Sequence, residues 1–175
     1  FTNTGQMHWI KVLDLPAGRL KDKGTPIDNL RNYDSKTETY IHVASLQSIS
    51  SSKVLFATKQ SMVKLVDGNE FIVAKKTTAA TKLAENDEVL LVYTLQGNET
   101  MVMRSAKEVF LRIACDTIPE KKKSALGVRG MKLDTNDELK NIYILSENET
   151  KSVEVKGKEI ALNRLHVGNR DTKGV

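Results

Sequence analysis

One motif recurs along the chain at intervals of about fifty residues, and this repetition constrains the fold more than any single residue does. The copies span residues 24–30, 77–83 and 127–133, and each ends in a leucine. An aspartate follows four residues after each leucine, and Asp34, Asp87 and Asp137 are separated by 53 residues (34 to 87) and 50 residues (87 to 137). A further copy begins near Gly174. Repeats of this period indicate units that bury their apolar faces against their neighbours. The chain is therefore expected to form one domain over residues 1–175, with approximate repeats 1–45, 46–95, 96–145 and 146–175. Because both ends interrupt a repeat, we expect it to be part of a longer protein.

Each repeat contains two apolar stretches separated by a short polar turn. These stretches are rich in Val, Ile, Leu, Phe and Thr, and they span Phe1–Lys11, Leu55–Val66, Val102–Ile113 and Val153–Leu162. Such a pattern predicts β-hairpins. No segment shows a sustained apolar stripe with helical spacing. The sequence therefore predicts an all-β fold of about four blades of antiparallel strands, arranged as in a propeller.

The composition excludes several classes of protein. With 39% hydrophobic residues, 28% charged residues and only 3 prolines, the chain is typical of a folded globular domain. The low aromatic content of 5% argues against proteins that stack single-stranded bases. No stretch approaches the length of a membrane span, and no secretory signal is recognisable, so we expect a cytoplasmic location without membrane contact. The sole cysteine, Cys115, follows an apolar run and is predicted to be a buried thiol.

Positive charge is concentrated in four segments that occupy the same place in each repeat. Segments 18–30, 74–83, 120–133 and 164–174 hold 14 of the 27 Lys and Arg residues but only 4 of the 22 acids. The rest of the chain carries 13 basic and 18 acidic residues, so the charges are segregated within the repeat. Equivalent positions of stacked or circular repeats lie along one edge. The four segments are therefore predicted to form a continuous basic track.

A track of this kind suits the phosphates of double-stranded DNA, which Lys and Arg neutralise with little sequence preference and with a steep dependence on salt. The candidate DNA-binding residues are Arg19, Lys21, Lys23, Lys75, Lys76, Lys82, Lys121, Lys122, Lys123, Arg129, Lys132, Arg164, Arg170 and Lys173. Five glycines in the same segments could bring backbone close to phosphates: Gly18, Gly24, Gly127, Gly130 and Gly174. The alternative is that lysines in loops only keep the surface soluble, although such lysines would have no reason to recur at one repeat position.

Other catalytic or ligand-binding chemistry is not indicated. The three histidines, His8, His42 and His166, lack the spacing of metal ligands, and no phosphate-binding loop motif occurs. The recurring aspartates are interpreted as turn residues whose side chains accept hydrogen bonds from their own backbone. No nucleophile can be paired with a base. We therefore expect no cofactor and no bound metal.

Several of these stretches match a known family. The segment from Phe1 to Gln6 and, more specifically, Gly127–Leu133 followed by Asn136–Leu139, resemble a blade of the C-terminal domain of DNA gyrase and topoisomerase IV A subunits. The resemblance covers essentially the whole chain. It implies a β-pinwheel whose blades exchange strands and around whose basic outer edge DNA bends. It also implies two protein partners: the rest of the topoisomerase A subunit and the ATPase B subunit.

The resemblance places the catalytic tyrosine of the parent enzyme, an ATP-dependent type IIA topoisomerase, in a separate domain beside an arginine. The four tyrosines here have no directly adjacent arginine: Tyr33, Tyr40, Tyr93 and Tyr143. The fragment is therefore expected not to be an enzyme by itself. Its expected contribution is to bind and bend or wrap duplex DNA in support of strand passage.

The chain departs from the family pattern in three places. Thr77 replaces the glycine that leads the repeat motif elsewhere, and other residues stand where Gly5 turns the first hairpin, namely Ser61, Glu108 and Glu159. We therefore expect altered turns in units two to four. The resemblance implies that members of the gyrase subgroup carry a short basic motif, or box, that contains a pair of glycines. The segment Gly168–Gly174 lacks that pair, which favours a topoisomerase IV-like protein. A propeller-like scaffold that binds a protein partner remains the alternative function.

Overall fold

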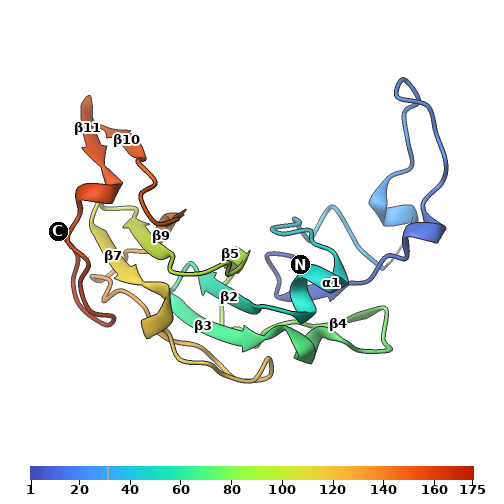
Figure 1. The fold of residues 1–175 in the computed structure, drawn as a ribbon, viewed down its shortest axis with the longest axis horizontal. Coiled ribbons are helices and arrows are strands. Elements are labelled where there is room, and N and C mark those ends of the chain that lie inside the picture. Colours follow the sequence, from blue (N-terminus) through green and yellow to red (C-terminus); the bar gives the residue numbers. More distant parts are fainter. Residues whose placement is uncertain (31) are drawn as a thin grey trace.

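The strands of the protein follow one another along a curved band, which Figure 1 shows as an arc open on one side. The structure is a computed structural model, and it describes residues 1–30 and 32–175. The strands are β1 (Gln6–His8), β2 (Lys53–Thr58), β3 (Met62–Asp67), β4 (Thr77–Ala79), β5 (Val89–Thr94), β6 (Thr100–Ser105), β7 (Phe110–Ala114), β8 (Val128–Arg129), β9 (Leu139–Leu145), β10 (Ser152–Val155) and β11 (Lys158–Ala161). The helical segments are short: α1 (Leu46–Ser50) and the 3₁₀ turns η1 (Val12–Asp14), η2 (Ile27–Asn29), η3 (Gly68–Phe71), η4 (Cys115–Thr117) and η5 (Leu162–Arg164).

The strands form four antiparallel sheets, which confirms the predicted all-β fold. The largest has the order β5-β2-β3-β8, and the next has the order β7-β6-β9. Two-stranded sheets are formed by β1 with β4 and by β10 with β11. Each sheet contains one of the predicted hairpins or, for β1, the second half of one, because short polar turns join apolar stretches.

Successive units exchange strands. The edge of each of the first three hairpins is completed by a segment from further along the chain, so that Met7 pairs with Thr78 and Val63 pairs with Val128. At the third hairpin, Phe110 of β7 and Val175 exchange two backbone hydrogen bonds of 2.8 and 2.9 Å. Each of the first three hairpins is therefore completed by a segment of the next unit, which is the strand exchange that the family resemblance implied.

The first three hairpin turns share one backbone conformation. The amide groups of Gly5, Ser61 and Glu108 donate to the carbonyl three residues earlier, and all three residues have positive φ angles of 76°, 61° and 66°. The prediction of altered turns was therefore wrong for units two and three. Side-chain contacts offset the strain of a left-handed residue other than glycine, because the Ser61 hydroxyl accepts the amide of Met131 at 2.7 Å and the Glu108 carboxylate binds Arg104 at 2.6 Å.

The fourth turn does differ, although not at Glu159, which lies inside β11. Here Val155 pairs with Lys158, and the two residues between them, Lys156 and Gly157, have φ angles of 49° and 76°. Two successive residues with positive φ match the tight two-residue turn that suits the twist of a hairpin.

A buried hydroxyl supports each of the first three turns. Thr2, Thr58 and Ser105 are buried, and the side-chain oxygen of each accepts the backbone amide four residues later, at 3.3, 3.1 and 3.4 Å respectively. The hydroxyl thus satisfies a backbone donor that the turn leaves without a strand partner.

The recurring aspartates are turn residues, as predicted. Asp34 accepts the amide of Lys36, and Asp87 and Asp137 each accept the amide of the next residue, all within 2.9–3.0 Å. Asp87 and Asp137 have a second role, because they also accept amides from the turn of the preceding hairpin. The donors are Gln60 at 3.0 Å and Lys107 at 3.2 Å. Each of these two carboxylates therefore ties a hairpin turn to a later segment of the same repeat.

The apolar core lies between units rather than within them. One cluster includes Leu55 and Leu65 from the second hairpin with Met101 and Ile113 from the third. Two further clusters lie on either side, between the first and second hairpins and between the third and fourth. Cys115 is buried in the central cluster, and burial raises the pKa of its thiol to about 12, as expected of a structural cysteine.

Candidate nucleic-acid interface

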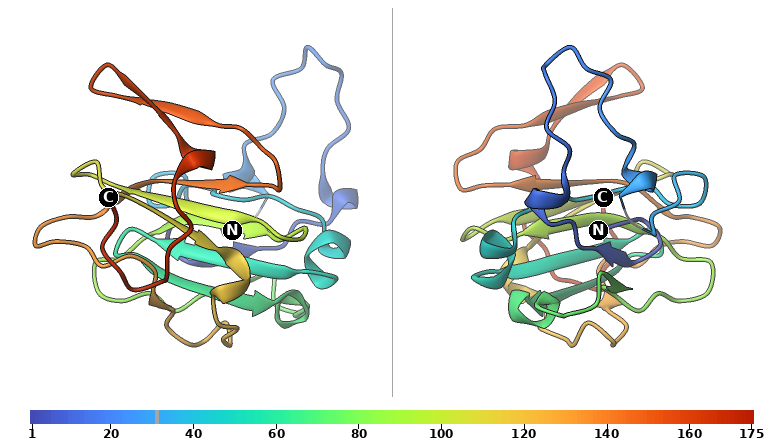
Figure 2. Two further views of the ribbon diagram at one scale, coloured as in Figure 1. Left: turned by 60° about the vertical axis from the view of Figure 1, so that its left-hand side comes forward. Right: turned by 90° about the vertical axis from the view of Figure 1, so that its right-hand side faces the viewer.

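Three of the four basic segments lie on the convex side of the arc. In Figure 1, segment 74–83, which contains β4, lies on the outer edge, segment 120–133 runs below β3, and segment 164–174 continues around the end next to β7. Segment 18–30 lies apart from them, on a loop that projects at the top of both views of Figure 2, on the side away from the outer edge. The structure therefore brings three of the four predicted clusters onto one edge and leaves the fourth away from it.

Most of the predicted basic side chains are available to a ligand. Twelve of the fourteen are exposed, and the other two, Lys123 and Arg170, are partly buried. Three take part in ion pairs: Lys122 with Glu70 at 3.2 Å, Arg129 with Asp171 at 3.3 Å, and Lys173 with Asp134 at 2.7 Å. Such exposed pairs contribute little to stability.

The remaining exposed cations have no ionic partner among the residues that the structure describes. They are Arg19, Lys21, Lys23, Lys75, Lys76, Lys82, Lys121, Lys132 and Arg164. These side chains can turn toward an anion without breaking an existing ion pair. They are therefore the part of the predicted set best suited to phosphate.

The lysine run 121–123 is less uniform than its sequence suggests. Glu70 of η3 accepts the backbone amide of Lys123 at 2.9 Å and pairs with Lys122, while the Lys123 ammonium donates to the backbone carbonyl of Glu70 at 3.0 Å. Within this run, only Lys121 lacks an ionic or hydrogen-bonded side-chain partner among the described residues. One acidic side chain therefore fixes the position of the two lysines that follow Lys121.

Two of the glycines that lead the connecting segments, Gly127 and Gly174, pack against the preceding hairpin. A Cβ atom on Gly127 would lie 2.7 Å from the carbonyl oxygen of Val63, and one on Gly174 would lie 2.2 Å from that of Phe110. These glycines allow the exchanged segment to lie flat on the preceding hairpin. At the corresponding place in the first unit, the hydroxyl of Thr77 lies 3.1 Å from Nδ1 of His8. Two members of the set stay open: no atom lies within 4 Å of such a Cβ on Gly24, and the nearest atom to one on Gly18 is a carboxylate oxygen of Asp22 at 3.5 Å. That these glycines bring backbone close to phosphates stays a prediction.

Two cations that the sequence analysis missed hold these segments from below. Lys64 of β3 is 1% exposed, and its Nζ donates to the carbonyls of Lys122, Lys123 and Ala125 at 3.1, 2.9 and 2.7 Å. Arg112 of β7 donates to the carbonyl of Asn163 at 2.6 Å. Burial lowers the pKa of Lys64 to about 8, against the opposing effect of Glu70. A lysine inside an apolar run was the available signal, but its partners are 58 to 61 residues away.

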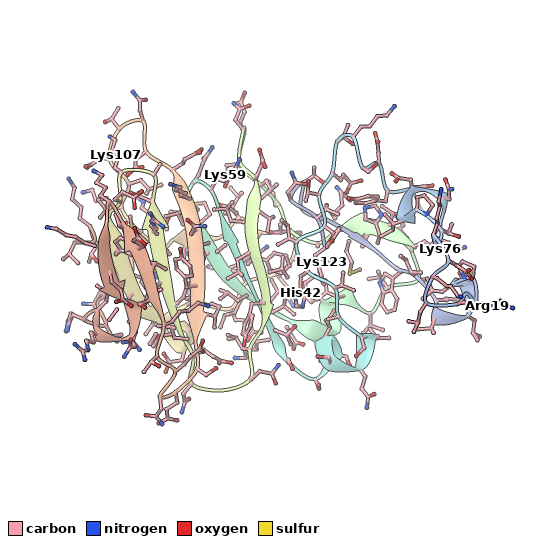
Figure 3. The ribbon with its side chains drawn as sticks, turned by 90° about the horizontal axis from the view of Figure 1, so that it is seen from above. Arg19, His42, Lys59, Lys76, Lys107 and Lys123 are labelled. Carbon is pink, nitrogen blue, oxygen red and sulfur yellow. The ribbon has the colours of Figure 1, made fainter. Side chains whose placement is uncertain are left out.

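Two lysines at the hairpin turns also lie outside the predicted set. Figure 3 shows Lys59 and Lys107 pointing from the same side of the molecule, while Arg19 lies at the far end from Lys107. Lys59 pairs with Glu88 at 3.2 Å, and the ammonium of Lys107 donates to the carbonyl of Thr135 at 2.7 Å. Both therefore contribute to contacts within their own repeats, 46–95 and 96–145.

Two of the three histidines, His8 and His42, have structural partners. His8 lies 3.0 Å from the Glu38 carboxylate, and Nε2 of His42 lies 3.3 Å from the Thr94 hydroxyl. Burial, with a smaller effect of the N-terminal ammonium, lowers the pKa of His42. Across residues 1–30 and 32–175, no group of three His, Cys, Asp or Glu side chains could hold a metal ion. In the same part of the chain, no helix has the length and apolarity to cross a membrane.

Comparison with known proteins identifies the family. A model described as DNA gyrase C-terminal domain, beta-propeller, matches residues 52–95 and 105–146. The chain is 30% identical over its whole length to the DNA gyrase A subunit of Lawsonia intracellularis (strain PHE/MN1-00), of which it covers 22%. It is also 30% identical to the DNA gyrase A subunit of Staphylococcus epidermidis, of which it covers 20%. The chain thus spans about a fifth of the length of these relatives.

Solved structures agree on the fold. The C-terminal domain of a DNA topoisomerase IV superimposes with a TM-score of 0.88 at 23% identity, covering all of this chain and 56% of that one. The E. coli ParC C-terminal domain gives 0.79 at 18% identity and is covered to 73%, and a gyrase A C-terminal domain gives 0.73 at 18% and is covered to 57%. These similarities confirm a β-pinwheel. The protein belongs to the family of C-terminal domains of DNA gyrase and topoisomerase IV A subunits.

Proposed function

We propose that this domain binds duplex DNA along its convex basic edge and bends it, without catalysing a reaction itself. The observation that carries the proposal is the recurrence of unpaired, exposed cations on one edge, at the same place in successive units. Neutralising phosphates with such cations releases counterions and gives affinity without sequence preference. The relatives are named as subunits of DNA gyrase, an enzyme of DNA, which supports the same ligand.

The arrangement of the cations favours bending over contact with straight DNA. A convex edge presents successive clusters that a straight duplex cannot reach together. Bending a site of 20–30 base pairs costs roughly 1–6 kcal/mol, so several clusters must act in concert to offset it. Loss of one cluster should therefore reduce bending more than simple binding.

The wider role follows from the family. We propose that the domain belongs to the A chain of an ATP-dependent type IIA topoisomerase, works with the rest of that chain and with an ATPase B subunit, and supports strand passage. A topoisomerase IV-like protein is favoured because segment 168–174 lacks the paired glycines of a gyrase box. The residues of this segment are occupied with the preceding unit, since Arg170 donates to the carbonyl of Arg129 at 3.0 Å and Lys173 pairs with Asp134.

Binding to a linear duplex long enough to wrap tests the proposal. Fluorescence anisotropy across a salt series would measure affinity, and energy transfer between labelled DNA ends would measure bending. We expect affinity that falls steeply with salt and ends that approach each other on binding. No binding even at low salt would contradict the proposal and would favour the protein-interaction scaffold instead.

A further inference from the structure

Two connecting segments of the convex edge are held by cations of the strands beneath them, of which Lys64 is buried and Arg112 is partly buried. Lys64 lies in β3 under segment 120–133, and Arg112 lies in β7 under segment 164–174. Neither is an exposed cation of the edge, and both direct their donors at backbone carbonyls. They differ in this respect from the fourteen candidate DNA-binding side chains.

The ammonium of Lys64 is fully used. It has three N–H donors, and three carbonyls of one short loop, those of Lys122, Lys123 and Ala125, accept them. The ammonium lies 5.8 Å from the centre of the Phe56 ring on the neighbouring strand, at a distance where a cation is attracted to the ring face. Because the side chain is 1% exposed, it cannot meet a phosphate directly.

Three carbonyls that converge on one point force the backbone of the loop to curve around it. The loop is also fixed at its start, where the backbone of Leu65 accepts the amide of Lys121 at 2.8 Å and donates to the carbonyl of Pro119 at 3.1 Å. With its carbonyls turned inward, the loop leaves Lys121 and Lys122 exposed. Removal of the ammonium would leave three inward carbonyls without this donor, so the loop would have to open toward water.

Arg112 repeats the arrangement in the next unit. Its guanidinium donates to the carbonyls of Asn163 and Leu165 at 2.6 and 3.4 Å and to the hydroxyl of Thr100 at 3.0 Å. These carbonyls flank the exposed Arg164 on both sides. The same type of contact therefore lies beneath an exposed cation in two successive units.

We propose that Lys64 is a positioning residue for phosphate binding, which holds loop 121–125 so that Lys121 and Lys122 face DNA, and that Arg112 does the same for Arg164. The inference rests on the proposed function and deepens it. A preformed loop binds its ligand more tightly because less conformational entropy is lost on binding. Lys64 thus acts on DNA only through the exposed lysines above it.

A double-mutant cycle in DNA binding tests this role. The variants are Lys64→Met, the pair Lys121→Gln with Lys122→Gln, and all three changes together, each measured by anisotropy across a salt series. We expect Lys64→Met to weaken binding about 3- to 10-fold and to reduce the salt slope by about 1. The combined variant should bind no more weakly than the Lys121→Gln, Lys122→Gln pair, because Lys64 acts through those lysines. A general loss of structure would instead add to the effect of the pair.

A matched variant controls for the lost charge. Lys140→Met removes one exposed lysine of β9, outside the basic segments, and should change affinity less than about twofold. Unchanged affinity and salt slope in Lys64→Met, or strictly additive losses in the cycle, would overturn this inference alone. Failure of the wild type to bind would overturn the proposed function and this inference with it.

The design also covers a variant that does not fold. If Lys64→Met shows no cooperative thermal transition, the same cycle is made with Arg112→Met and Arg164→Gln, again with Lys140→Met as control. Non-additive losses would support the positioning role, and additive ones would overturn it.

Discussion

Segments 18–30 and 120–133 occupy equivalent places in the repeat and both carry exposed cations, but only the second is held against the body of the molecule. In segment 120–133, Gly130 and Met131 are buried, β8 pairs with β3, and Lys64 fixes the loop. In segment 18–30, residues 18–26 are all exposed, and their hydrogen bonds to described residues are local, such as the bond from the Arg19 amide to Asp22. Equal charge therefore does not mean equal preorganisation.

The difference arises from what the two segments cover. Segment 120–133 lies over a hairpin whose apolar residues contact the next unit on the other side. The projecting loop covers no such surface, and apolar side chains beside it are exposed, including Leu13 at 96%. A segment becomes rigid when its backbone carbonyls and amides find partners in the neighbouring unit, and residues 18–26 of the projecting loop have no such partner among the described residues.

The largest expected effect concerns the buried charge under the anchored segment. Because the pKa of Lys64 is lowered from 10.5 to about 8, the unfolded chain binds a proton more readily than the folded one between these values. The free energy of unfolding should therefore rise as pH increases from about 8 to 10.5, by about 3 kcal/mol. The difference between the wild type and Lys64→Met, followed by urea unfolding, isolates this change from Cys115, whose raised pKa lowers stability above pH 9. A difference that does not vary with pH would contradict it.

A second effect compares one glycine in each segment. Gly127→Ala places a Cβ 2.7 Å from the Val63 carbonyl oxygen. In Gly24→Ala the Cβ meets no atom within 4 Å, so the only loss of stability comes from holding alanine in the left-handed conformation at φ 69°. We expect a loss of about 3 kcal/mol for the first and about 1 kcal/mol for the second. Chemical denaturation of both variants measures the pair. Equal losses would show that the two segments are equally anchored.

Removing positive charge from each segment compares how much the two segments contribute to DNA affinity. Two lysines are replaced in each, as Lys121→Gln with Lys122→Gln and as Lys21→Gln with Lys23→Gln. The first pair should weaken DNA binding about tenfold and the second about threefold, because the anchored loop loses less entropy on binding. Titrations at matched ionic strength decide this, and a larger loss in the projecting loop would reverse the comparison.

The smallest effect on stability is expected from cutting the projecting loop. Trypsin should cleave first within residues 19–23 and only later at 121–123, because exposed backbone without tertiary hydrogen bonds enters a protease most readily. Since residues 18–26 bury no side chain, the cut should change the free energy of unfolding by less than about 0.5 kcal/mol. Mass spectrometry of early fragments and a thermal melt of the nicked protein provide the two readings.

Much of the architecture was predictable from the residues. The turn role of Asp87 and the hairpins around Thr58 follow from local chemistry, because a short polar residue between two apolar stretches has few other uses. The altered turn at Ser61 was predicted wrongly, because the hydroxyl that stabilises it finds its donor 70 residues away, at Met131. The division of the chain into four repeats within one domain stays a prediction.

For the basic edge, too, some properties depend on residues close together in the sequence and others depend on tertiary contacts. Its cations could be selected from the sequence, because charge segregates by position within the repeat. Which of them are engaged could not, since Glu70 reaches Lys122 and Lys123 only after the strands have paired. The charge of a segment is thus set by its sequence, whereas the fold decides which of its charged side chains are already paired within the protein.

By itself, the sequence determined the all-β class, the positions of the hairpins, the turn role of the aspartates and the charge of the connecting segments, because each depends on residues close together in the chain. Only the tertiary structure decided that three segments share the convex edge, that Gly127 and Gly174 lie flat on the preceding hairpin, and that Lys64 supports a loop beneath exposed lysines. The physical reason is that these contacts end on backbone carbonyls. Every residue carries one, so the partner leaves no mark in the sequence until the units pack together.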